Sequence, residues 1–211
     1  VAAVVRYCAS HNIAIFPQGG NTSSVVGGIP VSEHPGVLLS LSRLDRVEHV
    51  DPDTNAMIVQ AGCTLDNARQ AAAQAGRLFP LTLASQGSCQ IGGNVATNAG
   101  GTAVLRYGNM RDLVLGLDVV LADGRVWKGL RTLRKDNSGY DMKSLFVGSE
   151  GTLGIVTRAS LKLFPRTDAT SLAFVAVPSP AAAIDLLGRA RESFGGDLDA
   201  CELFCRRQLS L

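Results

Sequence analysis

The sequence has few aromatic residues, few charges and few histidines. Aromatic residues make up 5% of its 211 positions, charged residues make up 18%, and only three histidines occur. The charges are dispersed and sum to +2, which argues against a basic stripe for nucleic acid or anionic lipid. With 46% hydrophobic residues, the composition is that of a folded protein and not of a disordered one. The length predicts one large domain or two small subdomains that each bury a core.

Long hydrophobic runs are also missing. The run 113–122 is interrupted by Gly116 and Asp118 and is too short to span a bilayer, so we expect no transmembrane segment. No secretory signal pattern is present. The five cysteines are odd in number and widely spread, which predicts reduced thiols and a cytoplasmic location. Cys201 and Cys205 make an incomplete ligand set with no histidine after them, so we expect no metal site.

Both ends of the sequence lie inside patterned segments. Residues 1–8 open within an amphipathic helix pattern without an N-cap, and residues 203–211 stop within an apolar pattern. From this we expect the chain to be a fragment.

The hydrophobic patterns mix both kinds of secondary structure. They predict helices at 65–75, closed by Gly76, and at 180–193, with one or two helical turns at 141–146. Hairpin signals and short apolar runs predict strands at 13–16, 37–41, 46–50, 56–61, 113–121, 125–130, 155–164 and 172–177. The stretch 84–108 is rich in glycine and shows little periodicity. Because strands and helices do not alternate strictly, the fold class is α+β and not a doubly wound sheet.

The 23 glycines are the unusual feature of the composition. Many of them lie in three loops, at 18–24, 85–101 and 148–154. None of these loops has the spacing of a Rossmann or P-loop motif. In the first loop, successive N–H groups and the Thr22 and Ser23 hydroxyls can converge on an anion, although a tight turn explains this motif alone equally well. In the second, glycines alternate with amides and hydroxyls over a length that favours a binding role for a flat ligand.

Together these segments resemble a known family. The sequence motifs at 17–22, 87–101, 134–141 and 145–154 resemble those of the vanillyl-alcohol-oxidase-type (PCMH-type) FAD-binding domain. Within that family they are most similar to the motifs of D-2-hydroxyglutarate and D-lactate dehydrogenases. The match keeps the order of the motifs and covers about residues 13–164. It implies two α+β FAD subdomains, at 1–45 and 46–167, followed by the start of a substrate (cap) domain at 168–211.

The resemblance also implies cofactor contacts. The first loop would wrap the FAD diphosphate with Gly19, Gly20, Asn21, Thr22 and Ser23. The second loop would run along the flavin and diphosphate with Gly87, Ser88, Ile91, Gly92, Asn94, Thr97 and Asn98. The third loop would hold the adenosine side, or the sheet beneath it, with Gly151, Gly154, Ile155 and Val156.

Departures from the family pattern predict noncovalent FAD. Members that tether flavin through histidine carry it in the first loop, where this sequence has Asn21. The three histidines, His11, His34 and His49, are expected at the surface or in turns, and Cys89 is expected to be a small packed thiol.

The resemblance implies oxidation of a small D-2-hydroxy acid, of the 2-hydroxyglutarate or lactate type, with hydride transfer to flavin. A quinone, a cytochrome or an electron-transfer flavoprotein would accept the electrons, which could place the protein at a membrane surface. The catalytic residues are expected in a C-terminal part that this fragment lacks, so the fragment itself is expected to be inactive. Three alternatives stay open: a flavin reductase of the same fold, an FAD-carrying subunit of a multi-subunit glycolate-type oxidase, and a ligand-free interaction module.

Overall fold

Five strands form an antiparallel sheet that organises the chain. A computed structural model describes residues 1–30 and 35–209. The strands of this sheet are, in spatial order, β3 (Val47–Asp51), β4 (Ala56–Gln60), β8 (Ile155–Lys162), β6 (Val114–Val120) and β7 (Val126–Gly129). β6 is buried along its whole length, as its nearly continuous apolar sequence predicts. Two further pairs complete the strands: β1 (Ala14–Gln18) runs parallel to β2 (Gly36–Ser40), and β5 (Arg77–Leu78) pairs with β9 (Phe164–Pro165).

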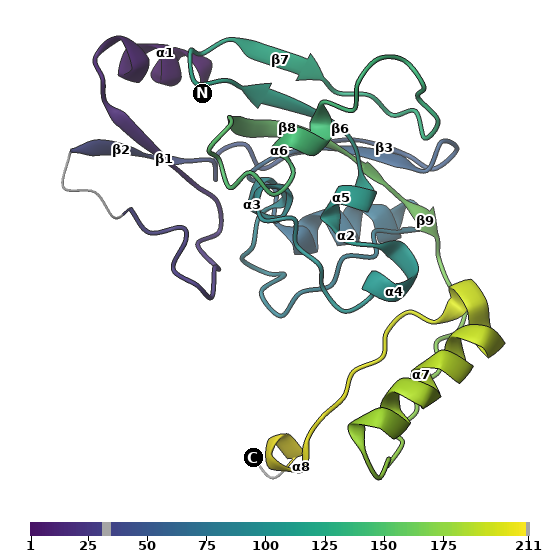
Figure 1. Cartoon of the computed structure of the whole chain (residues 1–211). Helices are drawn as coiled ribbons and strands as arrows, with labels where there is room; N and C mark the ends of the chain where they lie inside the picture. The colour runs from purple at the N-terminus through teal and green to yellow at the C-terminus, as the bar shows by residue number, and fades with distance from the viewer. Residues whose placement is uncertain (31–34, 210–211) are drawn as a thin grey trace.

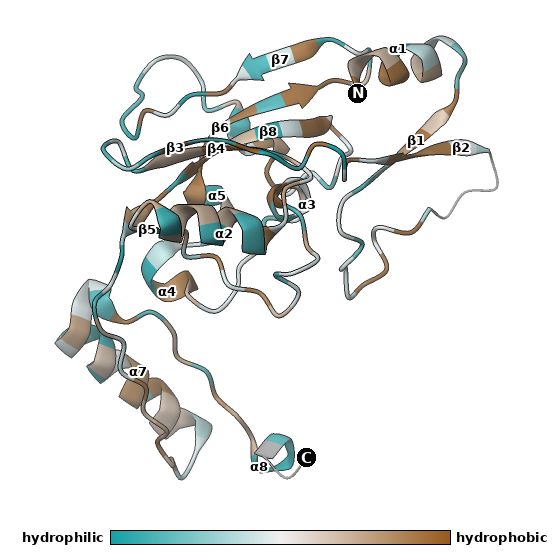
Figure 2. Ribbon diagram, turned by 180° about the vertical axis from the view of Figure 1, so that it is seen from behind, coloured by the Kyte–Doolittle hydropathy of each residue, from teal (hydrophilic) through white to brown (hydrophobic). Residues whose placement is uncertain are grey.

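Helices flank this sheet (Figure 1). On one side lie α2 (Leu65–Gln74), α3 (Ile91–Ala96), α4 (Val104–Tyr107) and α5 (Met110–Leu113). Near the β6–β7 turn lies α1 (Ala2–Ser10), where Arg6 Nη1 donates to the carbonyl of Gly124 at 3.2 Å. In Figure 2 the central strands β6 and β8 carry brown, hydrophobic segments beside teal ones, and the buried apolar side chains of sheet and helices form the core. Mixed helices and strands confirm the α+β prediction.

Local signals account for several of these elements. Thr64 caps α2 by accepting from the N–H of Asn67 at 3.2 Å, and Gly76 follows with φ +68°. The Asp123-Gly124 turn joins β6 and β7 with Gly124 at φ +79°, as predicted. The helix at 180–193 is also confirmed as α7 (Pro180–Phe194), which is capped by Ser179.

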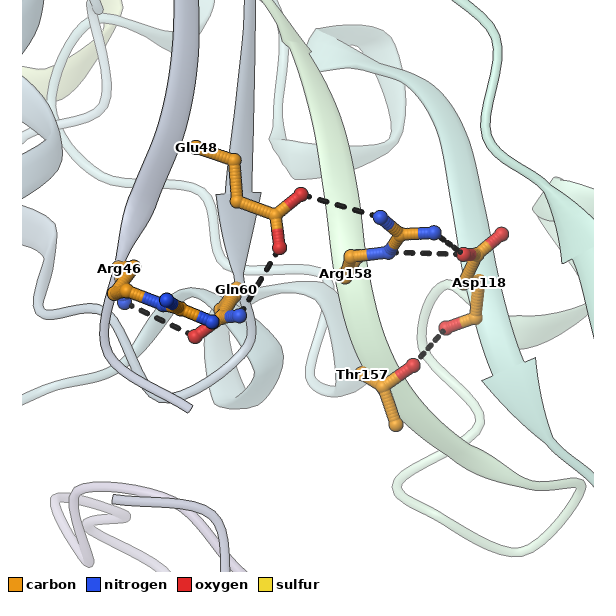
Figure 3. A network of polar contacts seen from close by, with 6 residues as sticks. All are labelled: Arg46, Glu48, Gln60, Asp118, Thr157 and Arg158. Carbon is orange, nitrogen blue, oxygen red and sulfur yellow. Dashed lines mark hydrogen bonds and ion pairs between the residues drawn. The ribbon is translucent and has the colours of Figure 1, made fainter. Parts of the chain in front are cut away.

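Polar side chains cross the sheet from β3 to β6 (Figure 3). Arg158 on β8 donates to Asp118 at 2.6 and 3.0 Å and to Glu48 at 3.2 Å. Gln60 Nε2 donates to the other oxygen of Glu48 at 3.0 Å. Asp118 is 4% exposed and Arg158 is its ion-pair partner, so the network links β3, β4, β8 and β6 through side chains.

The structure differs from the sequence-based expectations at 84–108 and at 172–177. The stretch 84–108 contains two short helices, α3 and α4, because tertiary contacts overcome its low helix propensity. No strand forms at 172–177 in the described part of the chain: Leu172 is 83% exposed and Phe174 84%, and no neighbouring strand pairs with them. Cys201 and Cys205 are exposed, and the backbone between them is not helical.

The remaining elements are short or lie near the end of the chain. α6 (Lys143–Phe146) precedes the third glycine loop, while η1 (Gly195–Asp197) and α8 (Arg206–Leu209) follow α7. His11 and His49 are exposed as predicted, and His34 lies outside the described residues.

Candidate functional site: three glycine loops around one helix

The first and second glycine loops touch at Gly20. A Cβ added to Gly20 would lie 2.0 Å from the carbonyl oxygen of Ser88 and 2.9 Å from Cα of Cys89. No side chain fits there, because the backbone of the second loop occupies the space. Gly19 lies beside α3, since its added Cβ would be 3.7 Å from the backbone of Gly93. Glycine is therefore required at position 20 by close approach of two backbones.

The third loop reaches the other end of the same helix. The N–H of Gly148 donates to the carbonyl of Val95 at 3.0 Å, and that of Glu150 to the carbonyl of Ala96 at 2.9 Å. Gly151, at φ +81°, faces Pro17, whose Cγ would lie 3.5 Å from an added Cβ. The structure thus brings all three predicted loops together around α3.

The exposed members of the predicted set lie along the open side of this arrangement. Asn21, Thr22 and Ser23 are exposed, and Asn21 turns the chain with φ +53°. Within the described residues, no backbone N–H from Gly20 to Ser23 donates a hydrogen bond, so these donors are free to bind an anion.

The second loop contributes to the same open side. Gly87 and Ser88 are exposed, and no atom lies within 4 Å of a Cβ added to Gly87. Thr97 is also exposed, with its hydroxyl donating to the carbonyl of Gly93 at 2.9 Å. Asn98 adopts φ +50° and accepts from the N–H of Arg111 at 2.9 Å, which fixes the end of the loop.

Other residues of the predicted set are buried beneath the open side and support α3. The N–H groups of Ile91 and Gly92 donate to the carbonyls of Cys63 and Ala61 at 2.9 and 2.7 Å. The Ile91 side chain is fully buried, and a Cβ on Gly92 would lie 2.8 Å from Cβ of Ala61. These contacts press α3 against the end of β4.

The predicted residues at the start of β8 are equally buried. A Cβ on Gly154 would lie 2.6 Å from Cγ1 of Val119, and the side chains of Ile155 and Val156 pack in the core. Gly151, Gly154 and Ile155 line a cavity of about 220 Å³ whose other walls include Ile15, Pro17 and Val120. Complete ligand pockets usually enclose about 300–1,000 Å³, so this cavity has room for only part of a dinucleotide.

Two buried amide oxygens, one on the residue that precedes α3 and one within α3, have no hydrogen-bond partner among the described residues. Gln90 Oε1 and Asn94 Oδ1 accept no hydrogen bond, although the residues are only 8% and 4% exposed. Gln90 Oε1 would lie 3.6 Å from a Cβ on Gly19, at the junction of the first two loops. Because a buried acceptor without a donor costs stability, these oxygens are suited to accept from a bound molecule. Gln90 was not among the predicted residues; its only sequence signal is an amide two positions before Gly92-Gly93.

The two cysteines near the loops are buried. Cys89 is buried in the core, as predicted for a small packed thiol. Burial, with a smaller contribution from the charge of Asp45, raises the pKa of Cys63 to about 11. Neither side chain is placed as an exposed nucleophile.

These features fit FAD. The backbone at Gly20 leaves no room for a side chain, and the N–H groups that follow it are free to bind a diphosphate. The adjoining apolar cavity can receive a ring attached to that diphosphate. Among the described residues no group of three histidine, cysteine or acidic side chains is arranged to hold a metal ion. Nor does any described helix have the length and apolar character needed to cross a membrane.

Comparisons with known proteins agree with this geometry. The family model described as FAD binding domain matches residues 1–129. The mitochondrial D-2-hydroxyglutarate dehydrogenase of Bos taurus is 46% identical over 202 residues, covering 96% of this chain and 37% of that protein. A D-2-hydroxyglutarate–pyruvate transhydrogenase of Saccharomyces cerevisiae is 37% identical over 206 residues, covering 98% of this chain and 41% of that protein. A solved alkyldihydroxyacetonephosphate synthase superposes with a TM-score of 0.77 at 26% identity, over 92% of this chain and 35% of that one.

Two consequences follow from these matches. The predicted family resemblance is confirmed, and the chain spans well under half the length of these relatives. The name of the bovine relative includes "mitochondrial", so the comparisons lend no support to the cytoplasmic location expected from the cysteines.

Proposed function

Since this chain belongs to the FAD binding domain family, we propose that it is the FAD-holding part of a dehydrogenase that oxidises D-2-hydroxy acids to 2-oxo acids. The observation that carries the proposal is the contact of Gly20 with Ser88, which joins two loops into one backbone cradle. The names of the relatives support a substrate of the 2-hydroxyglutarate type, and another relative, whose name includes "D-lactate dehydrogenase", keeps lactate as the smaller alternative.

In this proposal each loop has its own part of the cofactor. The N–H groups from Gly20 to Ser23 bind the diphosphate, helped by the hydroxyls of Thr22 and Ser23. The open edge at Gly87, Ser88, Thr97 and Asn98 runs along the flavin side, and the cavity at Gly151 receives part of the adenosine. Ile91, Gly92, Gly154, Ile155 and Val156 act from beneath by fixing α3 and the start of β8.

Gln90 and Asn94 complete the cradle as acceptors for cofactor hydroxyl or N–H groups. With Asn21 at the position of the tethering histidine and Cys89 packed in the core, the cofactor is held noncovalently.

When bound, FAD supplies the hydride acceptor for the C2–H bond of the hydroxy acid. The residues described here bind and orient that cofactor. The groups that bind the substrate carboxylate and take the hydroxyl proton belong to the longer protein, whose electron acceptor is a quinone, a cytochrome or an electron-transfer flavoprotein. The chain alone is therefore expected to bind FAD without oxidising the hydroxy acid.

We also propose three structural units, at 1–45, 46–167 and 168–211. Separate sheets support this division: among the described strands β1 and β2 pair with each other alone, and the five-stranded sheet lies within 47–162. The exposed apolar side chains of 172–194 support a third unit that starts after the sheet.

The test is to saturate the purified chain with FAD, remove free cofactor, record the visible spectrum and precipitate the protein with acid. A flavin spectrum whose colour moves to the supernatant supports noncovalent FAD. Colour that stays in the pellet contradicts noncovalent binding, and a colourless protein contradicts the cradle. With the longer protein, reduction of an artificial dye by D-2-hydroxyglutarate supports the dehydrogenase, whereas NADPH oxidation instead would favour the flavin reductase.

A further inference from the structure

A groove of about 670 Å³ lies beside the loop at residues 130–142, between β7, α6 and the end of β8. This loop contains residues 134–141, a motif of the family resemblance to which the FAD cradle gives no role. None of the proposed cradle residues lines the groove. The groove is therefore a second candidate site, and its function does not depend on the proposed FAD chemistry.

Positive charge dominates the groove. Six cationic side chains face three carboxylates: Arg111, Lys128, Arg131, Arg134, Lys143 and Lys162 against Asp112, Asp136 and Asp141. Two of the carboxylates have cationic partners within the groove, because Asp136 pairs with Arg131 and Asp141 pairs with Lys143. The third, Asp112, accepts from the N–H of Asn109 at 3.0 Å as a helix cap.

The other four cations form no ion pair with any residue that the structure describes. Arg111 donates to the carbonyls of Ser144 and Val147, both at 2.6 Å, and Arg134 donates to the carbonyl of Leu163. A carbonyl satisfies the N–H groups of a guanidinium but leaves its charge uncompensated. Among residues 1–30 and 35–209, Lys128 makes no ion pair.

Lys162 is the least exposed of these four cations. Its side chain is partly buried at the end of β8 and makes no hydrogen bond or ion pair within the described part of the chain. Burial lowers the pKa of Lys162. The charge of Asp112 has the next largest effect and raises it, while the charges of Arg134 and Lys143 lower it by less. Lys162 and Arg134 are like charges without an ion pair in the described part of the chain, so an anion that enters the groove stabilises them.

We propose that this groove binds a small anion with two negative charges, presented by phosphate or carboxylate oxygens. Lys162 and Arg134 contact the anion, and Lys128 lies at the rim on β7. Bound anion would also bridge the 130–142 loop to β8, which connects the otherwise unassigned motif to the sheet.

The only tryptophan of the sequence, Trp127, lines the groove and reports on it directly. FAD-free chain is titrated with sodium phosphate and, separately, with succinate, while sodium chloride at matched ionic strength serves as reference. We expect a saturable change in Trp127 emission with at least one dianion. Saturation by phosphate alone assigns the groove to phosphate ligands, and saturation by succinate alone assigns it to dicarboxylates.

Lys162→Gln should weaken this binding about tenfold, because a charge-assisted contact is lost. Lys135→Gln is the matched control, since Lys135 follows Arg134 in the sequence but does not line the groove. If Lys162→Gln is unstable, Lys128→Gln on the exposed side of β7 is used instead, with a smaller loss expected. Emission that follows ionic strength alone, or equal affinity in wild type and the groove variants, would overturn the proposal.

Discussion

Asp118 and Arg158 join the two central strands of the sheet through their side chains. The Asp118 carboxylate is 4% exposed and accepts two bonds from Arg158 through one oxygen, while its other oxygen has no partner (Figure 3). We expect Asp118→Ala to lower the free energy of unfolding by roughly 2 kcal/mol, because Arg158 then loses its buried partner. Arg158 is partly exposed and keeps Glu48, which limits the loss.

Urea unfolding followed by far-UV circular dichroism measures this effect. Asp53→Ala is the control, because the Asp53 side chain is exposed and its carboxylate makes no hydrogen bond or ion pair within the described residues. A change within about 0.5 kcal/mol is expected there. Equal losses in both variants would contradict the role of the Asp118 network.

The thiols should separate into two classes by exposure. Cys201 and Cys205 are exposed, whereas Cys8, Cys63 and Cys89 are buried. The pKa of Cys63 is raised to about 11, so its reactive thiolate is scarce at neutral pH. We expect a chromogenic disulfide reagent to titrate two thiols quickly in the native chain and all five in denaturant. Rapid reaction of a third thiol under native conditions would show that the core is more open than described.

At the scale of elements, the loop at 131–138 depends on one carboxylate. Hydrogen bonds from Ser138 and Arg131 lower the pKa of Asp136 to about 2. Because the folded pKa is lowered, these contacts stabilise the loop above the ordinary value of 3.8 and are lost as the pH falls toward 2. The amide proton of Ser138, which donates to Asp136 at 3.0 Å, should titrate in NMR spectra with a midpoint of about 2. A midpoint near 3.8, or the same titration in Asp136→Asn, would contradict this.

The elements also show what sequence reasoning can and cannot reach. The β6–β7 hairpin was predictable because Asp123-Gly124 specifies its turn locally. Helix α3 was not, since its glycines disfavour a helix and its first N–H groups depend on the distant carbonyls of Ala61 and Cys63. The predicted strand at 172–177 was wrong because alternation of apolar residues cannot provide a partner strand.

The same distinction holds for the candidate site. Composition located the three loops, because glycine, amide and hydroxyl residues cluster in them. It could not separate the open edge at Gly87 and Ser88 from the buried supports at Ile91 and Gly92, because that depends on which face of α3 meets β4. The unpartnered oxygen of Gln90 is likewise a result of packing.

At the scale of the whole molecule, Arg106 helps to attach the last part of the chain to the body. Arg106 on α4 forms ion pairs with Asp197 and Asp199, both at 3.1 Å, and α7 extends away from the sheet (Figure 1). We expect Arg106→Gln to speed tryptic cleavage at Arg166 severalfold. The ion pairs that hold residues 197–199 to α4 are then lost, so the exposed segment 166–176 opens more often. Arg189→Gln on α7 is the control, and equal cleavage rates in both variants would contradict the anchoring role.

The central claim is that contact between the first two glycine loops creates the FAD cradle, and the affinity of Gly20→Ala for FAD tests it most directly. The added Cβ would meet the Ser88 carbonyl at 2.0 Å and force the loops apart, so flavin fluorescence titration should show affinity lower by about tenfold or more. Gly188→Ala in α7, where nothing lies within 4 Å, should bind as wild type. If Gly20→Ala does not fold, the double variant Thr22→Ala, Ser23→Ala should show the loss instead. Folded Gly20→Ala that binds FAD as tightly as wild type would contradict the cradle.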